Sequence, residues 1–409
     1  MRIGLFTDTY FPQVNGVATS VKTLADQLTL LGHEPFIFTT TDPEALPDEP
    51  ENIIRLRSVP VISMPDRRFV MAGLPTVLRI AHRYKLDIIH TQTEFGVGIL
   101  GKVVANRLHI PVIHTLHTKY EDYVHFVANG RLIRPSMIKY IIRTFLLGTE
   151  ALICPSQMTF EAAAGYGIKV PIRVIPTGIE LARFQGSDVE AEKIRQDLKQ
   201  EESETLLLSL SRLSLEKNIQ AVIRAFPEVI KAASARLVIV GEGAYREELE
   251  KLVIELELEA HVTFVGQVEN DQVVNYYKAA DFFISASTSE TQGLTFSEAL
   301  ASGTPVIAHW NPYLADLVDL PEFGQLFEYE EAMAFTILTA INQTPALDPE
   351  HFQKKLYEIS AENFGRKVAE FYKDEIDCYA QANKGLVRSL TKTPSTINQI
   401  FKKYGKMRK

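Results

Sequence analysis

The stretch from residue 289 to residue 308 combines two carboxylates with a glycine in a way that suits a charged, hydroxyl-rich ligand. Glu290 and Gly293 lie in a short loop between a strand-like run, residues 281–285, and a helical run, residues 296–301, that contains Glu298. Amides at the start of a helix bind anions, and glycine lets a phosphate approach the backbone closely. The pattern predicts a site for a phosphorylated ligand such as a nucleotide sugar.

The same residues also fit a purely structural interpretation. Residues 295–298 read Thr-Phe-Ser-Glu, which matches a capping box in which Glu298 satisfies an amide of its own helix. Glu290 fits an ordinary solvated loop acid. For so short a motif the structural interpretation is the more frequent outcome, so both stay open at this point.

Strands and helices must position these residues, and both halves of the chain predict an alternation of the two. Such an alternation indicates doubly wound α/β domains, in which ligands bind beyond the carboxyl ends of the strands. Residues 176–178, Pro-Thr-Gly, are predicted to form a hinge between the halves. The first half predicts strands at residues 2–7, 35–39, 53–56, 88–90 and 112–114 and helices at residues 18–31, 75–84 and 98–108. The second half predicts strands at residues 206–211, 237–240, 262–265 and 304–308 and helices at residues 218–232, 245–256, 271–279 and within 350–383.

Length and composition bound the class of protein. A chain of 409 residues, 46% hydrophobic and 23% charged, is long enough for two or three domains with full cores. Its two cysteines, Cys154 and Cys378, form no disulfide framework and are expected to be reduced, as in a cytosolic protein. No window of 18 apolar residues exists, and Asp8 interrupts the first apolar run, which is expected to be a strand and not a signal peptide.

The net charge of −8 is distributed unevenly along the chain. Residues 1–183 hold 19 basic and 16 acidic groups, residues 184–383 hold 16 and 35, and residues 384–409 hold 8 and none. The middle part, at −19, is therefore expected to avoid anionic surfaces, whereas the first part, at +3, and the tail, at +8, are not.

Two further patterns are expected to carry no chemistry. Residues 96–103 match a P-loop except at the last position, where Val103 replaces the hydroxyl that would hold magnesium, so an ordinary helix start is expected. His114 and His117, with Glu121 and Asp122 nearby, have no standard zinc spacing. No metal site is expected.

A set of landmarks in fixed order makes a family resemblance visible. The second half carries Ser-Arg-Leu at 211–213, Glu-Lys-Asn at 216–218, LVIVGEG at 237–243, VTFVGQV at 262–268 and then the stretch from residue 289. The first half carries FPQVNGV at 11–17, Asp-Ile-Ile-His at 87–90 and VIPTGIELARF at 174–184. This combination resembles the retaining, family-four glycosyltransferases of the GT-B fold. The resemblance implies an α/β protein with two Rossmann-like domains facing across a cleft: an acceptor domain at residues 1–177, a nucleotide-sugar domain at 178–365, and a helix within 366–409 that crosses back before a basic tail.

The resemblance implies a role for several charged residues. Arg212 and Lys217 match the cations that hold the donor diphosphate, which would stabilise the leaving group without a metal or other cofactor. Glu298 matches the acid that holds the ribose hydroxyls, and Glu290 the acid near the hydroxyls of the donor sugar. Gly16 matches the glycine of the first loop that approaches the diphosphate.

The other residues implied by the resemblance lie beside the donor. His117 matches the histidine that touches the donor sugar at the reaction centre, although on its own it fits a satisfied histidine at a strand end. Thr291, Gln292, Gly293 and Leu294 match the loop that receives the nucleotide sugar. No carboxylate is evident as a nucleophile. The implied mechanism is therefore a front-face displacement in a cleft that closes around the hinge and excludes water.

Two departures from the common family pattern narrow the acceptor. Residues 15–16 are Asn-Gly where many relatives have Gly-Gly, and residues 290–294 are Glu-Thr-Gln-Gly-Leu where many have Glu-Gly-Phe-Gly-Leu. The second version, and the opening residues 6–21, resemble the branch that makes glucosyl-diacylglycerol in Gram-positive membranes, a precursor of the lipoteichoic acid anchor. The implied acceptor is a diacylglycerol-type lipid.

A lipid acceptor requires contact with a bilayer. In the helical run from residue 138, Ile138, Ile141, Ile142 and Phe145 share one stripe and Lys139 another, which suits an interfacial helix on anionic lipid. An ordinary helix packed on the sheet has the same pattern. A loop at residues 67–71 and the basic tail are further candidate membrane contacts, and the tail has no base-reading module that would indicate nucleic acid.

Together these expectations describe a peripheral enzyme on the cytoplasmic face of the membrane. It would move a hexose, glucose in the first instance, from a UDP-sugar to diacylglycerol. The alternatives are the same chemistry on a soluble, polysaccharide or cell-wall acceptor, and a nucleotide-sugar-binding protein without catalysis.

Overall fold

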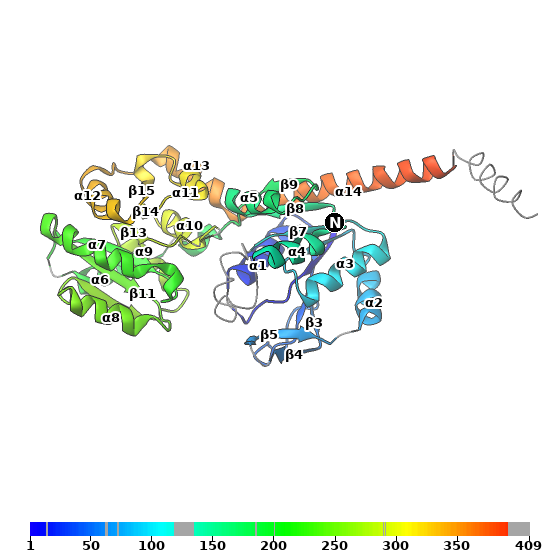
Figure 1. Cartoon of the computed structure of the whole chain (residues 1–409), viewed down its shortest axis with the longest axis horizontal. Coiled ribbons are helices and arrows are strands. Elements are labelled where there is room, and N and C mark those ends of the chain that lie inside the picture. Colours follow the sequence, from blue (N-terminus) through cyan, green and yellow to red (C-terminus); the bar gives the residue numbers. More distant parts are fainter. Residues whose placement is uncertain are drawn as a thin grey trace, which may run out of the picture.

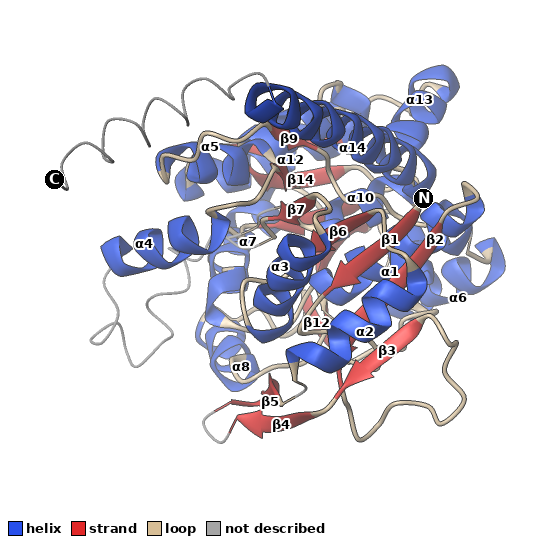
Figure 2. Ribbon diagram, turned by 90° about the vertical axis from the view of Figure 1, so that its right-hand side faces the viewer, coloured by secondary structure: helices blue, strands red, loops and turns tan. Residues whose placement is uncertain are grey.

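The computed structural model describes residues 1–13, 15–61, 64–71, 73–117, 135–184, 186–199, 201–288, 290 and 292–391. Figure 1 shows two lobes side by side, with a long helix, α14 (Ala361–Thr391), running from the second lobe along the first. Each lobe is built on its own parallel sheet. In Figure 2 the first lobe lies in front, with helices α1, α2 and α3 beside the strands of its sheet. The predicted α/β class with two doubly wound lobes is confirmed.

The first lobe contains a seven-stranded sheet in the order β3-β2-β1-β6-β7-β8-β9. Its strands are β1 (Arg2–Phe6), β2 (Glu34–Thr40), β3 (Ile53–Leu56), β6 (Ile88–Thr91), β7 (Val112–Thr115), β8 (Ala151–Cys154) and β9 (Ile172–Val174). Its helices are α1 (Gly16–Leu30), α2 (Leu74–Tyr84), α3 (Gly96–Leu108), α4 (Pro135–Leu146) and α5 (Gln157–Gly165). The inner strands β6, β7 and β8 are buried along their whole length, because helices cover both faces of a parallel sheet.

The second lobe contains a six-stranded sheet in the order β12-β11-β10-β13-β14-β15. Its strands are β10 (Thr205–Leu210), β11 (Ala235–Val240), β12 (Val262–Gly266), β13 (Phe282–Ser285), β14 (Val306–His309) and β15 (Gly324–Phe327). Its helices are α6 (Asp188–Leu198), α7 (Ile219–Ala232), α8 (Arg246–Glu255), α9 (Val273–Ala279), α10 (Leu294–Ala301), α11 (Pro312–Leu317), α12 (Met333–Gln343) and α13 (Pro349–Ile359). In both sheets the strand order reverses at the first strand of the lobe: β1 lies between β2 and β6, and β10 lies between β11 and β13.

The chain passes between the lobes twice, and the two passages lie side by side. Ile179 and Ser360 form an isolated parallel bridge, with the amide of Ile179 donating to the carbonyl of Ile359 at 2.9 Å and the amide of Ala361 donating to the carbonyl of Ile179 at 2.8 Å. Gly178 packs so closely on this second passage that a Cβ would lie 2.2 Å from the Ser360 carbonyl oxygen. Any motion of the lobes must therefore bend both passages together.

Beyond the second passage, α14 packs on the first lobe. Phe364, Val368, Phe371 and Tyr372 belong to the same buried cluster as Ile3 of β1, together with other residues of β1 and α1. The Tyr372 hydroxyl also lies 2.6 Å from Nδ1 of His90, a buried residue of β6. The last helix thus completes the core of the first lobe, and the domain limits expected at residues 177 and 365 stay predictions.

One local prediction was wrong, and one alternative that the sequence left open is decided. Residues 67–71 were expected to form a loop, but most of them belong to β5 (Met64–Val70), which pairs antiparallel with β4 (Ser58–Val61). In α4 the apolar stripe packs on the sheet, the second of the two alternatives: Ile142 and Phe145 are 3% and 8% exposed and Ile138 packs beside them. Because α4 covers the sheet with that stripe, only Ile141 of the four lies exposed, at 54%.

Candidate functional site

The candidate site lies where the strand order of the second sheet reverses. β10 and β13 are neighbours in the sheet, with Leu207 paired to Phe282, but the helices that follow them return to different sides. The loop after β10 carries Arg212 and a 3-10 turn, Leu215–Lys217, and the loop after β13 carries Glu290 and Gly293. Such a reversal leaves room for a ligand between the two loops, and it brings these sequence-predicted residues together.

Lys217 and Glu290 meet across this reversal. The ammonium of Lys217 donates to Oε1 of Glu290, and the two side chains are 24% and 17% exposed. Arg212 donates from Nη2 to Oε1 of Glu216 at 2.8 Å and is 69% exposed. Both predicted phosphate-binding cations are therefore held by carboxylates in this structure, and an arriving diphosphate would compete for them.

The start of α10 provides backbone donors beside this pair. Gly293 precedes the helix with φ of 74°, and a Cβ on it would lie 2.6 Å from the ring of Phe296. Only glycine fits this position without strain. Within the described part of the loop no side chain caps the helix start, and the amide of Phe296 donates to the carbonyl of Gly293 at 3.2 Å. Among the contacts of the described residues this leaves the amides of Leu294 and Thr295 to face an anion.

Glu298 does not form the capping box that was the structural alternative for it. The helix begins at Leu294, and Glu298 accepts a 3.1 Å hydrogen bond from the buried hydroxyl of Tyr277 through Oε2. Burial raises the pKa of Glu298, and the Tyr277 hydroxyl and the nearby Arg183 guanidinium oppose that rise. A half-buried carboxylate held in this way is suited to accept hydrogen bonds from ligand hydroxyls.

Gly16 lies at the start of α1 in the first lobe. It is exposed, and a Cβ there would have open space among the described residues, none of which requires glycine at this position. The preceding Asn15 caps the helix, because its Oδ1 accepts from the amides of Val17 at 3.1 Å and Ala18 at 3.0 Å. The departure from Gly-Gly therefore gives α1 a side-chain cap, and α10 is left as the helix start better suited to an anion.

His117 lies at the carboxyl edge of the first sheet, just after β7. Its Nε2 lies 2.8 Å from Oε1 of Gln92, which follows β6. Burial, and secondarily the nearby His114, lower the pKa of His117 to about 3, so its imidazole is neutral at physiological pH. The interaction with Gln92 favours the tautomer that carries hydrogen on Nε2 and leaves Nδ1 as an acceptor.

Sequence reasoning missed the polar residues around His117. Gln92 is 3% exposed, and its Nε2 has no hydrogen-bond partner among the described residues. Glu94, also buried, lies with Oε1 3.2 Å from Nε2 of His114. The signal that could have revealed them is their place directly after the buried strand β6, beside the reversal of the first sheet.

The remaining loop residues of the predicted site point in different directions. The side chain of Gln292 turns toward the inter-lobe passage, where Oε1 accepts from the amide of Thr177 at 2.9 Å and Nε2 donates to its carbonyl at 2.7 Å. Leu294 packs partly buried on the core of the second lobe. Thr291 lies outside the described residues.

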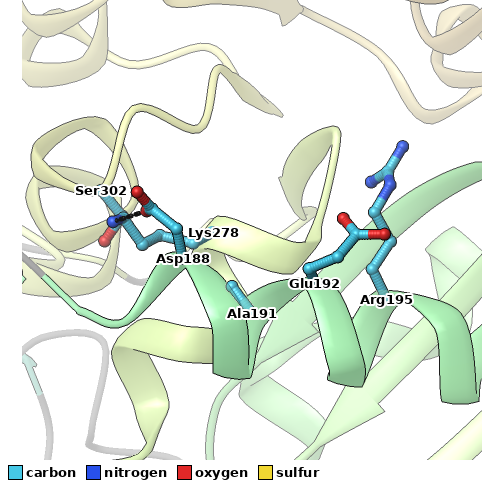
Figure 3. A pocket seen from close by; sticks show the side chains of 6 residues that line it. All are labelled: Asp188, Ala191, Glu192, Arg195, Lys278 and Ser302. Carbon is cyan, nitrogen blue, oxygen red and sulfur yellow. Dashed lines mark hydrogen bonds and ion pairs between the residues drawn. The ribbon is translucent and has the colours of Figure 1, made fainter.

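Two other observations bear on alternative sites. A surface pocket of about 210 Å³ lies between α6 and α9, where the Asp188 carboxylate and the Lys278 ammonium are paired (Figure 3). Its lining shares no residue with the candidate site, and the helix start that it contains, at Asp188 of α6, is already capped by the Ser187 side chain. Within the described ranges, no three His, Cys, Asp or Glu side chains are grouped as metal ligands would be.

Comparisons with known proteins agree with this geometry. Residues 14–183 match the family model described as Glycosyltransferase Family 4, and residues 190–358 match Glycosyl transferases group 1. The chain is 51% identical, over 98% of its length and 91% of the relative's, to the alpha-monoglucosyldiacylglycerol synthase of Streptococcus pneumoniae. It is 30% identical, over 88% of its length and 96% of the relative's, to the protein of the same name from Acholeplasma laidlawii.

Solved structures share the fold. The Anabaena protein HepE, determined in complex with UDP, has a TM-score of 0.73 at 20% identity and covers 91% of this chain and all of its own. A glycosyltransferase from Rickettsia africae also has a TM-score of 0.73, at 19% identity, covering 92% of this chain and 98% of its own. These likenesses extend over both lobes and the passages between them.

Proposed function

The chain belongs to the family 4 glycosyltransferases, and from this premise we propose that it transfers glucose from UDP-glucose to diacylglycerol. The observation that carries the reaction type is the meeting of Lys217 with Glu290 at the reversal of the second sheet, beside the open start of α10. The names of the two relatives supply the sugar and the acceptor.

The donor lies on the second lobe in this proposal. Arg212, Lys217 and the first amides of α10 neutralise the diphosphate, whose negative charge grows as it leaves. When the donor binds, the Lys217 ammonium leaves the Glu290 carboxylate and pairs with a phosphate of the donor. The carboxylate can then accept hydrogen bonds from the sugar hydroxyls. Glu298 accepts hydrogen bonds from the ribose. The two cations carry the charge stabilisation that a metal ion supplies in other transferases.

The reaction proceeds on one face of the sugar. The bond between the anomeric carbon and the diphosphate oxygen breaks, the acceptor hydroxyl oxygen bonds to that carbon from the same side, and its proton passes to the departing phosphate oxygen. The products are UDP and α-glucosyl-diacylglycerol. The neutral imidazole of His117 offers the donor sugar a hydrogen-bond partner without adding a charge next to the developing oxocarbenium ion.

The acceptor is delivered at a membrane surface by the first lobe. Met137, Tyr140 and Ile141 of α4 are exposed at 49%, 72% and 54%, and the positively charged Lys139 and Arg143 are exposed beside them. Apolar groups flanked by cations suit the interface of an anionic bilayer.

α4 lies beside α3, and α3 lies beside β5. The Phe145 ring of α4 packs near Gly98 of α3, and Gly96 packs near Val70 of β5. Phe95, just before α3, and Ile99 of α3 are also exposed. No described helix is long and apolar enough to cross a membrane. In this proposal the protein acts peripherally, on the cytoplasmic face.

A transfer assay tests the function directly. The purified protein is incubated with radiolabelled UDP-glucose or UDP-galactose and vesicles that contain diacylglycerol, and the lipid products are separated and their anomeric configuration read by NMR. We expect an α-linked glucosyl lipid and an equal amount of UDP. UDP release with a soluble glucan but not with diacylglycerol would keep the chemistry and overturn the acceptor. Binding of UDP-glucose with no UDP release would overturn catalysis.

The membrane surface has its own test. Replacing Tyr140→Asp and Ile141→Asp together is expected to abolish co-sedimentation with phosphatidylglycerol vesicles, because two apolar contacts are lost and two like charges are added. Phe335→Asp, at a side chain 74% exposed on α12 of the second lobe, is the matched control and is expected to leave binding unchanged. Equal binding by all three proteins would place the membrane contact elsewhere.

A further inference from the structure

The Gln292 side chain contacts the passage between the lobes, and donor binding does not require this contact. Its side chain is 6% exposed and bonds through both ends of its amide to the backbone of a single residue, Thr177, in the first passage between the lobes. The two residues are 115 positions apart in the chain. The loop that carries Glu290 and Gly293 is thereby tied directly to the connection between the lobes.

The connection continues into the first lobe. The hydroxyl of Thr177 lies 2.9 Å from the hydroxyl of Ser20, and both side chains belong to buried residues. Ser20 lies on α1, four residues after Gly16, which corresponds to about 6 Å along the helix. A chain of three side chains therefore joins the loop of the second lobe to the helix whose start holds Gly16.

On its other side the amide is braced by the core of the second lobe. Gln292 also contacts the hydroxyl of Tyr313, which lies 3.0 Å from the hydroxyl of Ser297 on α10. The backbone on either side is constrained too, because Gly293 requires a positive φ and Gly178 is pressed against Ser360. The amide is thus held between two rigid parts of the protein.

We propose that Gln292 is a positioning residue that couples the donor loop to the inter-lobe hinge. This inference rests on the function proposed above. The coupling sets where Glu290 and Gly293 lie relative to the first lobe when the lobes close on the donor. By linkage, a donor that fixes the loop also favours the closed arrangement, and closure favours the donor. A side chain that can both donate and accept is needed, because the amide and the carbonyl of Thr177 face it together.

The test separates positioning from nucleotide binding and from stability. Gln292→Met keeps the size of the side chain and removes its hydrogen bonds to Thr177 together with its contact to the Tyr313 hydroxyl. Gln343→Met, at an exposed position at the end of α12, is the matched control. UDP affinity is measured by calorimetry, transfer by the glucosyl-lipid assay, and compaction on adding UDP by small-angle X-ray scattering. For Gln292→Met we expect a fall in kcat of about tenfold, equivalent to roughly 1.4 kcal/mol, and a UDP dissociation constant raised by no more than about tenfold, because the contribution of closure to UDP binding is lost. We also expect the UDP-induced compaction to be lost, whereas Gln343→Met keeps all three values.

A second pair of variants tests the far end of the connection without altering the loop. Thr177→Val removes the hydroxyl that reaches Ser20, and Thr177→Ser retains it. We expect Thr177→Val to lose part of both kcat and compaction and Thr177→Ser to retain them. This pair decides the matter if Gln292→Met does not fold.

Three results would overturn the proposal. In the first, Gln292→Met keeps kcat and compaction within about twofold of wild type. In the second, its UDP affinity falls while the UDP-induced compaction is kept, which indicates a direct contact with the nucleotide. In the third, wild type does not compact with UDP. If the proposed function itself is wrong, the result is different: the wild-type protein binds UDP and compacts but forms no glucosyl lipid.

Discussion

Lys217→Met is the variant that most directly tests the proposed diphosphate site. Two unit charges about 4 Å apart interact by about 4 kcal/mol at an effective dielectric constant of about 20. The Lys217 side chain is 24% exposed, so solvent weakens this interaction, and Arg212 remains to carry part of the charge. We therefore expect a loss of about 2–3 kcal/mol in transition-state stabilisation, or a fall of roughly 30- to 150-fold in kcat/KM.

The assay compares three proteins under identical conditions. Steady-state transfer from UDP-glucose to diacylglycerol in vesicles is measured for Lys217→Met, for Lys217→Arg and for Lys251→Met, which removes an exposed lysine from α8. The arginine variant is expected to recover part of the rate because it keeps the charge, and the α8 variant to match wild type. Thermal unfolding checks that the fold survives the loss of the contact with Glu290.

A fall of less than about threefold in Lys217→Met, or an equal fall in the α8 control, would refute the reasoning. The leaving group would then be neutralised elsewhere, and the ammonium would serve only to hold the Glu290 loop.

Three further predictions follow from the site. Glu298→Gln is expected to raise the KM for UDP-glucose about tenfold with a smaller change in kcat, and to bind UDP and 2′-deoxy-UDP equally; a preserved preference for UDP would show that the carboxylate does not reach the ribose. Because the folded pKa of His117 is depressed to about 3, the stability due to its neutral form is fully present above pH 6.5 and is lost as pH falls toward 3, at up to about 1.4 kcal/mol per pH unit. His117→Gln should therefore flatten the fall in urea midpoint between pH 6.5 and 4, and an unchanged slope would contradict the assignment. Gly293→Ala should destabilise the protein by about 1–3 kcal/mol and weaken UDP binding, because its φ of 74° and the Phe296 ring leave no room for a Cβ, whereas Gly165→Ala, with open space around it, should do neither.

The sequence predicted the architecture well because the strands of both lobes are short apolar runs separated by amphipathic helices. Glu290 and Gly293 were placed at one site because they share a loop after a predicted strand, where parallel sheets bind ligands, and the family resemblance added Lys217. The structure supplies the strand order, in which β10 and β13 are neighbours and their loops share an edge of the sheet. The direction of a side chain within such a loop needs a contact with a distant part of the chain, and Gln292, turned toward Thr177, is the example.

The helix α4 shows a second limit. The stripe containing Ile138, Ile142 and Phe145 is equally apolar whether its partner is a sheet or a bilayer, so periodicity cannot choose between them. The exposed residues Met137 and Tyr140, which the structure identifies as the outer face, interrupt the polar side of the helix. The strand at residues 64–70 was missed because, among the described strands, its partner is β4 in a separate two-stranded sheet, and its residues do not alternate between apolar and polar.

The packing of α14 on the first lobe has a consequence for how the protein is made. The core around Ile3 is completed by Phe371 and Tyr372, so the lobe that leaves the ribosome first waits for residues translated near the end of the chain. The second lobe, whose sheet runs from residue 205 to residue 327, can fold meanwhile on its own contacts. A chimera that exchanges acceptor lobes between relatives must accordingly carry α14 with the first lobe, since a cut at the first passage alone would separate the two halves of one core.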